Sequence, residues 1–367
     1  MSAATERLAG LRRRYAAVEL VLFFCAGFLL DVFTLGRIDR PLVLFRQGFF
    51  LCALAGLLLL EHRHAVGLFV PQGRWARAWG FHPEAIHFLF GTLLSNFTVF
   101  YFKSAAGWLP GLFLALLSGL LVVNELPRFR RSGALVRLGL FAFCAGSYLA
   151  YLLPVVAGVV RRELFQLSLV LAGAVTAMLS LWMASWERAA GRGGTALRRL
   201  GLGWSVLAAM YGLYAAGAIP PVPLNVRVMG LYHRVQHVGA RYELERFTPA
   251  GAEPWRWPWE REAFHAREGD RVHLFARIFA PRAFRDRVYV RWMRAEGGGW
   301  RTTDRIPFTI QGGREDGYAG YAWKQHFQPG AWRVEVETED GRTVGRKDFE
   351  LVADPGSGER VLAREQR

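Results

Sequence analysis

Apolar residues occur in seven long, nearly uninterrupted runs over the first 219 residues, after which the pattern changes to a period of two. A helix needs about 20 apolar residues to cross a hydrocarbon core of ~30 Å. The runs reach about that length, are rich in Leu, Phe, Ala and Gly, and alternate too weakly for strands, so they predict seven transmembrane helices. They cover Tyr15–Leu35, Pro41–Leu60, Glu84–Phe102, Gly107–Leu126, Ala134–Ala157, Leu164–Ser185 and Leu200–Ile219.

From about Arg227 apolar and polar residues alternate, as they do in Val272–Ile278, Val288–Trp292 and Trp332–Val336. Such alternation is typical of strands with one buried and one wet face. Gly-rich turns separate these segments, and Asp340-Gly341 predicts a hairpin between Trp332–Thr338 and Arg342–Val352. Seven or so short strands favour a sandwich. The fold class predicted is an α+β membrane protein, a seven-helix transmembrane bundle followed by an all-β immunoglobulin-like sandwich.

The prolines of Ile219–Leu224 predict a stiff, extended connection between the two parts. We therefore expect a transmembrane domain over residues 1–219, a proline-rich linker over 220–226, a β-sandwich over 227–354 and a flexible tail over 355–367.

The distribution of charge predicts how the helices are oriented. Residues 1–220 hold 21 Lys and Arg against 9 Asp and Glu, and the basic residues lie between apolar runs. With the N-terminus in the cytoplasm, the inner segments carry 15 of these cations and the outer loops 5. Seven crossings then place the β-sandwich outside the cytoplasm. The same arrangement assigns the net charge of +16 to membrane topology rather than to nucleic-acid binding.

Composition excludes several other classes of protein. With 52% apolar, 14% aromatic and 21% charged residues, the chain is neither disordered nor collagen-like, and it is not a disulfide-stapled miniprotein.

Charged and polar residues near the outer ends of the first three runs form a candidate polar pocket. Its members are Asp31, Arg37, Asp39, Lys103 and Ser104. Burying such groups in lipid is unfavourable, so they are expected either to bind an anionic headgroup or a lipid-linked sugar, or to form ion pairs that fix helix packing. In the second interpretation, Arg37 pairs with Asp39 and Lys103 with Asp31.

Trp255, Trp257 and Trp259 alternate with other residues and form a candidate aromatic surface. Three indoles on one side of an extended segment suit sugar stacking or a membrane-dipping edge. The alternative is that they cap the open end of the sandwich. Trp292 and Trp332 fall on faces predicted to be buried and are expected in the core.

No metal site, cofactor or catalytic group is predicted. The histidine pairs His62/His64 and His233/His237 each lack the third ligand that a zinc site requires. The chain has no glycine-rich phosphate loop, nucleophile elbow or paired-carboxylate signature, so an enzyme is the less favoured interpretation.

The C-terminal region carries Pro329-Gly330-Ala331-Trp332-Arg333-Val334-Glu335-Val336, then Asp340-Gly341-Arg342, Gly345-Arg346, Phe349 and Val352. Together with the Ile219–Leu224 linker, Thr34–Asp39 and Tyr101–Ala105, these residues resemble a bacterial family of multi-spanning membrane proteins that end in the domain of unknown function 2914. One departure is the run Tyr318–Trp323, where members of that family often carry a Tyr-Arg-hydroxyl sequence. The resemblance implies the architecture described above and supplies no activity.

Two functions are therefore expected. In the first, the helices anchor a β-sandwich that binds or scaffolds an envelope component, either a glycan, a lipid headgroup or a periplasmic protein. In the second, the bundle is a membrane enzyme or carrier for an anionic or lipid-linked substrate at its outer face. A plain structural role without any ligand is a third possibility. The lipid bilayer is a partner in all of them, and nucleic acid in none.

Overall fold

The structure is a computed structural model of the chain, and it describes residues 40–125, 133–193, 195–239, 241–247, 261–281, 284–311, 317–356, 358 and 360–367. The chain forms two compact units. The helical unit comprises the residues up to Lys103 together with Leu109–Leu153 and Glu163–Ile219. The β unit comprises Pro220–Arg367 and two short segments, Ser104–Trp108 and Pro154–Arg162.

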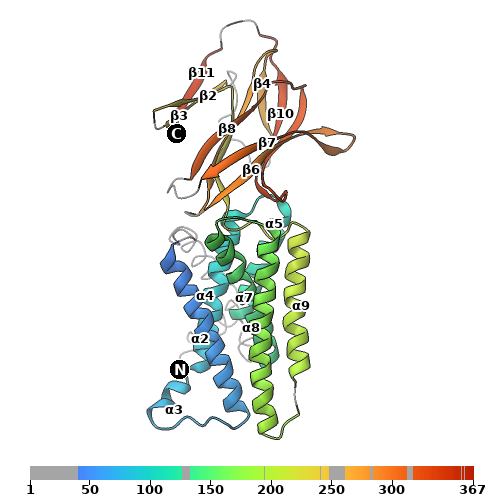
Figure 1. Cartoon of the computed structure of the whole chain (residues 1–367). Coiled ribbons are helices and arrows are strands. Elements are labelled where there is room, and N and C mark those ends of the chain that lie inside the picture. Colours follow the sequence, from blue (N-terminus) through green and yellow to red (C-terminus); the bar gives the residue numbers. More distant parts are fainter. Residues whose placement is uncertain are drawn as a thin grey trace, which may run out of the picture. The chain divides into compact units, whose positions relative to one another are not determined.

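Long helices run side by side in the helical unit (Figure 1). The described helices are α2 (Pro41–Ala65), α3 (Arg74–Trp79), α4 (His82–Ser104), α5 (Trp108–Glu125), α7 (Ala134–Ala157), α8 (Arg162–Ala189) and α9 (Ala196–Ala215). All of them except the short α3 coincide with a predicted apolar run. The first predicted run, Tyr15–Leu35, lies outside the described residues.

Four of the described helices are long and apolar enough to cross a membrane, namely α2, α4, α7 and α8. Helix α5 has 18 residues, and its apolar sequence continues through Val123 before Asn124 and Glu125. Helix α9 begins with Arg198 and Arg199 and contains Trp and Tyr residues, which lower its mean hydropathy. The predicted count of seven spans thus remains a prediction, whereas the four apolar helices indicate association with a membrane.

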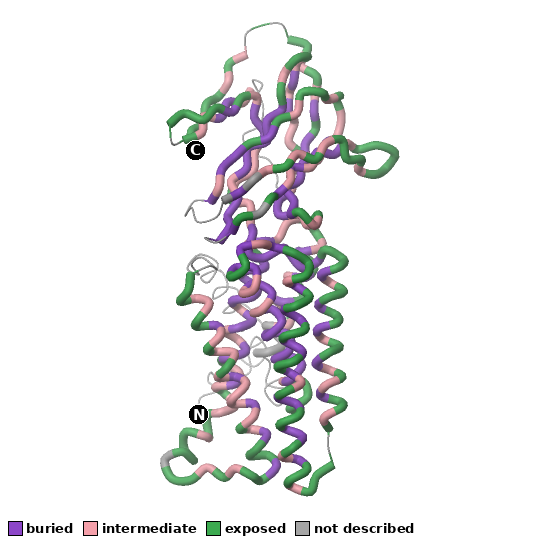
Figure 2. The backbone as a smooth tube through the Cα atoms, viewed as in Figure 1, coloured by how far each residue is buried: buried purple, intermediate pink, exposed green. Residues whose placement is uncertain are grey.

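The outward faces of these helices carry large apolar side chains. Phe45 is 73% exposed and Phe49 is 59% exposed on α2, and Leu181 is 55% exposed on α8. Exposed apolar surface of this kind is expected of residues that face lipid. In Figure 2 the buried positions recur at intervals along α8, on one of its faces.

Polar side chains within the helices mostly satisfy their hydrogen bonds locally. The hydroxyls of Thr98, Thr176 and Ser180 each donate to the carbonyl four residues earlier, at 2.7, 2.8 and 2.8 Å. This bonding lets small polar residues lie inside an apolar helix without an unpaired donor.

Eleven described strands make up three sheets in the β unit. Their bounds are β1 (Asn225–Tyr232), β2 (Arg234–Val238), β3 (Arg241–Phe247), β4 (Glu262–Ala266), β5 (Val272–Phe279), β6 (Arg285–Glu296), β7 (Gly299–Gln311), β8 (Tyr318–Lys324), β9 (Gly330–Thr338), β10 (Thr343–Ala353) and β11 (Leu362–Gln366). The strand orders are β1-β5-β8, β4-β10-β9-β6-β7 and β11-β3-β2.

The predicted strands and the predicted hairpin are confirmed. Strands β9 and β10 pair antiparallel around Asp340-Gly341, and Gly341 has φ +80°, a conformation that favours glycine. Trp292 and Trp332 are 0% and 2% exposed, as expected for core residues.

The three-stranded sheet β1-β5-β8 and the five-stranded sheet share one apolar core. Leu274 and Ile278 of β5 belong to the same buried cluster as Val290 of β6 and Val334 of β9. Two sheets packed over a common core are a sandwich. One pair, β4 with β10, is parallel, whereas both sheets of an immunoglobulin sandwich are antiparallel.

The ends of this region differ from the expected linker and tail. Pro220–Leu224 is buried rather than a free spacer, and Leu224 belongs to the core of the β unit. The expected flexible tail contains β11, which pairs antiparallel with β3. Burial of the apolar side chains and backbone pairing hold these two segments in place.

The segment Pro154–Arg162 contributes directly to the β unit. Val160 is 6% exposed and belongs to the apolar core, and the carbonyl of Gly158 accepts a 3.0 Å hydrogen bond from the amide of Arg285. The core of the β unit is therefore built from parts of the chain that are distant in sequence.

The face of β9 that alternation predicts to be wet is instead covered by arginine side chains. Glu335 and Glu337 lie on this face and are only 1% and 2% exposed. In register across the sheet, Arg346 of β10 and Arg291 of β6 flank Glu335, and Arg305 of β7 follows Arg291. Ion pairs of 2.6 Å join Glu335 to Arg346 and to Arg291, and Glu337 to Arg305. Long guanidinium side chains therefore exclude water from a charged row.

His233, just before β2, joins three strands through its ring. Its Nδ1 accepts a 3.2 Å hydrogen bond from the amide of Phe247, and its Nε2 donates one of 2.8 Å to the carbonyl of His265. The ring also stacks on Phe264, with centroids 4.2 Å apart. This bonding requires the neutral ring, and burial lowers the pKa of His233 below its usual value of 6.5.

We expect the β unit to lose stability as the pH falls below about 6.5. The unfolded histidine has a pKa near 6.5 and takes up its proton before the folded one does, so acid favours unfolding down to the lowered pKa of the folded state. At pH 7.5 both states are neutral and the full stability is present. The measurement is the unfolding temperature of the full chain at pH 7.5 and 5.5. His233→Gln should reduce the dependence, the remainder coming from His273, whose pKa is also lowered by burial, and His326→Gln, at an exposed position, should leave it unchanged.

Candidate functional site

Most residues that the sequence nominates lie outside the described chain. Asp31, Arg37 and Asp39 of the predicted polar pocket are among them, as are Trp255, Trp257 and Trp259. Lys103 and Ser104 end α4, where Lys103 is half-buried and Ser104 is 3% exposed. The predicted pocket and the predicted aromatic surface thus remain predictions.

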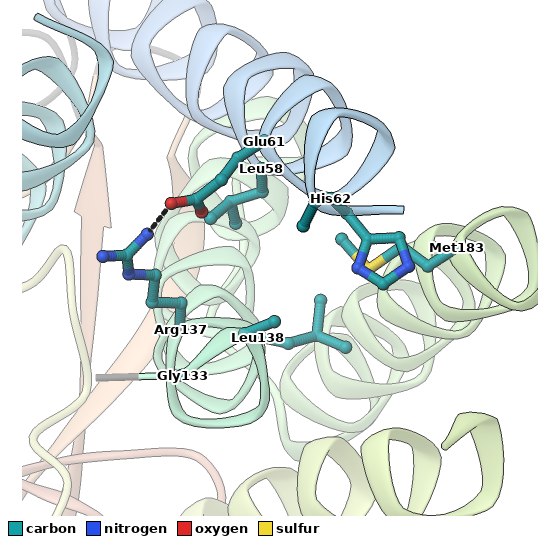
Figure 3. Close-up of a pocket in the computed structure, with 9 residues that line it drawn as sticks. Leu58, Glu61, His62, Gly133, Arg137, Leu138 and Met183 are labelled. Atoms are coloured by element: carbon teal, nitrogen blue, oxygen red, sulfur yellow. Dashed lines mark hydrogen bonds and ion pairs between the residues drawn. The ribbon is translucent and has the colours of Figure 1, made fainter. Parts of the chain in front are cut away.

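The described residues of the helical unit contain a different pocket, which we call the bundle pocket (Figure 3). It has a volume of about 290 Å³ and lies where α2 ends, α7 begins and α8 approaches its end. Its lining combines apolar and ionisable side chains: Leu58, Glu61, His62, Ala65, Gly133, Ala134, Arg137, Leu138 and Met183.

An ion pair borders one side of the bundle pocket. Arg137 of α7 donates to the Glu61 carboxylate of α2, and the two side chains point toward one another in Figure 3. His82 Nε2 lies 3.7 Å from the same carboxylate oxygen. The His82 ring is held by a 2.6 Å hydrogen bond from its Nδ1 to the carbonyl of Trp79 and by stacking on the Trp79 indole at 4.3 Å. The proton on Nδ1 leaves Nε2 facing Glu61.

A second charged cluster adjoins the opposite side. Glu187 of α8 accepts two hydrogen bonds from Arg199 of α9, at 2.7 and 3.0 Å, and a third of 3.2 Å from the amide of Thr195. His62 lines the pocket, and its Nε2 lies 3.4 Å from Glu187. Bidentate pairing of this kind is the strongest arrangement available to a buried carboxylate.

The chemistry available at the bundle pocket is the binding of a small polar group. Glu61 lies beside Arg137 and His82, and Glu187 lies beside Arg199 and His62. With both histidines neutral, the two negative carboxylates and the two positive guanidinium groups cancel in charge. An imidazole beside a carboxylate and a guanidinium can exchange hydrogen bonds with a small polar group. Within the described ranges, no three His, Cys, Asp or Glu side chains are grouped to hold a metal ion.

Sequence reasoning considered His62 only as a candidate metal ligand, and it missed Glu61 and the role of Arg137 and Arg199. These partners lie 76 and 12 residues from the carboxylates they bind. The available signal was positional, because each of these ionisable residues falls at the end of an apolar run, where helices of a bundle meet.

The β unit contains a second candidate site, which we call the β8 face and define as Tyr321, Trp323, His273 and Arg271. Tyr321 and Trp323 are 41% and 43% exposed. His273 of β5 stands opposite Trp323 in the antiparallel pair β5–β8, and its ring centroid lies 6.0 Å from that of Tyr321. The Arg271 guanidinium lies 4.4 Å above the Trp323 ring.

Residues 285–351 match the family described as "Protein of unknown function (DUF2914)". The matched segment begins with β6 and ends within β10. It contains Glu335, Glu337 and the three arginines that pair with them. This supports the resemblance for the C-terminal region alone. No curated protein matches the chain.

Solved structures with similarity to parts of the chain share very little of its geometry. Two are β-glucosidase from Listeria innocua, in complex with glucose (14% identity, TM-score 0.19, 24% of this chain and 14% of that one) and with gluconolactone (12% identity, TM-score 0.17, 34% and 16%). A third is the alkylpurine DNA glycosylase AlkC of Pseudomonas fluorescens bound to DNA with an abasic site analog (11% identity, TM-score 0.21, 86% and 99%). The chain spans about one sixth or less of the two glucosidases. TM-scores this low indicate no common fold.

Proposed function

We propose that the chain is a multi-spanning protein of the bacterial inner membrane whose β unit lies outside the cytoplasm and binds an envelope component. The observation that carries this proposal is the β8 face, where two large aromatic rings are exposed in a unit whose Trp292 and Trp332 are fully enclosed. Exposed aromatic side chains beside polar groups are typical of recognition surfaces.

Two further features support membrane anchorage and orientation. The four apolar helices are long enough to span a bilayer, and basic residues favour one set of connecting segments by 15 to 5. The immunoglobulin-like form of the sandwich belongs to this proposal: two packed sheets that share one core support it, and the parallel β4–β10 pair departs from it.

The orientation is tested with reporters in the full chain. We expect alkaline phosphatase, which is active only outside the cytoplasm, to be active when fused after Arg367. Green fluorescent protein fused at the same point should stay dark. The matched control is insertion of each reporter after Gly193, in the exposed turn between α8 and α9, where the opposite results are expected. A fluorescent C-terminal fusion would overturn the proposal.

The bundle pocket favours a second candidate function, a membrane enzyme or carrier for an anionic or lipid-linked substrate. Arg137 and His62 in a cavity of about 290 Å³ provide groups that can bind such a substrate. The pocket lies near the C-terminal end of α8, and α9 begins at that end of the bundle and finishes at Ala215. The pocket and Ala215 are therefore at opposite ends of the bundle. An extracytoplasmic C-terminus would therefore place the pocket on the cytoplasmic side. The reporter experiment thus decides which compartment the pocket faces.

A further inference from the structure

Strand β8 presents its two aromatic rings away from the main core of the β unit. The residues on either side of Tyr321 face inward: Ala322 belongs to the core, and a Cβ on Gly320 would clash with the Phe308 ring. With a rise of about 3.4 Å per residue, Tyr321 and Trp323 stand roughly 7 Å apart on the same side of the strand. They form a short row of stacking surfaces.

The neighbouring strands fix this row in place. Tyr242 of β3 donates a 3.1 Å hydrogen bond from its hydroxyl to the carbonyl of Ala319, and its ring centroid lies 6.5 Å from that of Tyr321. Phe275 is paired in register with Tyr321, so it lies on the same face of the sheet, where it is fully buried. The rings therefore rest on a packed support rather than on a mobile loop.

His273 carries an unused hydrogen-bonding atom at the same place. The side chain is 9% exposed, and its Nδ1 has no hydrogen-bond partner among the described residues. A buried polar atom without a partner costs about 1–3 kcal/mol. Burial lowers the pKa of His273, which keeps the ring neutral at physiological pH. With its proton on Nε2, the neutral ring leaves Nδ1 as an acceptor that the protein encloses, out of reach of a ligand on the surface.

Arg271 adds a positive charge at the edge of the β8 face. It is exposed, and within the part of the chain that the structure describes it forms no ion pair. A guanidinium held flat on an indole keeps its N–H groups directed sideways, where they can bind a carboxylate or phosphate.

We propose that the β8 face binds an acidic glycan of the cell envelope, an assignment that rests on the proposed function above. A pyranose ring presents C–H groups on its face, which stack on Tyr321 and Trp323. The acidic substituent pairs with Arg271. A face of four side chains is far smaller than the ~800 Å² per partner of a stable protein–protein interface, so a sugar chain fits better than a folded protein.

The test compares two tetrasaccharides binding to the full chain in detergent micelles. One alternates N-acetylglucosamine with N-acetylmuramic acid and carries carboxylates, and the other is the neutral tetra-N-acetylchitotetraose. Calorimetry should show tighter binding of the acidic probe. Trp323→Ala should weaken both probes by about tenfold, whereas Arg271→Gln should weaken only the acidic one. Tyr321→Ala provides a second ring variant, and Trp75→Ala, which removes an indole that is 78% exposed in the helical unit, is the matched control.

Three results would overturn the glycan assignment. They are no binding of either probe to the wild-type chain, unchanged binding in both ring variants, and equal loss in Trp75→Ala. If the C-terminal reporter is still extracytoplasmic in that case, only the ligand class has failed and the proposed function stands. A cytoplasmic reporter would instead refute the proposed function, whichever probe binds.

Discussion

Glu335→Ala should lower the free energy of unfolding of the β unit by about 3 kcal/mol. The carboxylate is 1% exposed and sits between the guanidinium groups of Arg346 and Arg291, each at 2.6 Å. Removing Glu335 takes this partner from Arg346 and leaves Arg291 with Glu337 alone, 3.0 Å away, and loss of one partner of a buried ion pair costs about 3–5 kcal/mol. We expect the lower end of that range because both arginines retain some contact with water.

Hydrogen exchange of the β9 and β10 amides in the full chain measures this change as a lower opening free energy. Glu339→Ala is the matched control, since Glu339 pairs with Arg161 at 3.5 Å and both side chains are about half exposed. Exposed pairs contribute at most about 1 kcal/mol. Similar losses in the two variants would show that the Glu335 cluster behaves as ordinary surface charge.

Arg199→Ala should destabilise the helical unit by a comparable amount, about 3 kcal/mol. The change removes both charge-assisted hydrogen bonds to Glu187 and leaves that carboxylate with Thr195 and His62 in a site where its side chain is 8% exposed. The uncompensated negative charge is the source of the loss.

The measurement is an SDS titration of the protein in dodecyl maltoside, followed by circular dichroism at 222 nm. Arg198→Ala is the control, because Arg198 precedes Arg199 on α9 and is exposed. Adding Glu187→Gln to the Arg199→Ala background should restore part of the stability, since it removes the unpaired charge. If the double variant were less stable than Arg199→Ala alone, unpaired charge would not be the cause.

Features encoded by local periodicity could be predicted from the sequence. Apolar runs predicted six of the described helices, and alternation with Asp340-Gly341 predicted the β9–β10 hairpin, because both depend on residues close together along the chain. The number of membrane crossings is less well defined. Helix α9 shows why, since two arginines in its first turn make it ambiguous by composition.

Features that depend on distant neighbours could not be predicted. Glu335 alternates with Val334 and Val336 as a wet residue would, yet Arg291 and Arg346 on adjacent strands cover it. The bundle pocket requires Glu61 and Arg137 to meet across two helices. From the sequence alone Trp323 could be assigned neither to the core nor to the surface. Its place on the β8 face follows from its pairing with His273. Strand register and helix contacts decide these sites, and neither is encoded locally.

The contribution of Val160 and Gly158 to the β unit has a practical consequence for fragment design. A polypeptide begun at Pro220 would lack one side chain of its own interior and would leave the Arg285 amide without its acceptor. Such an excised piece should melt at a lower temperature than the same strands in the intact chain. Adding residues 154–162 back, as a separate peptide or by circular permutation, should recover the difference.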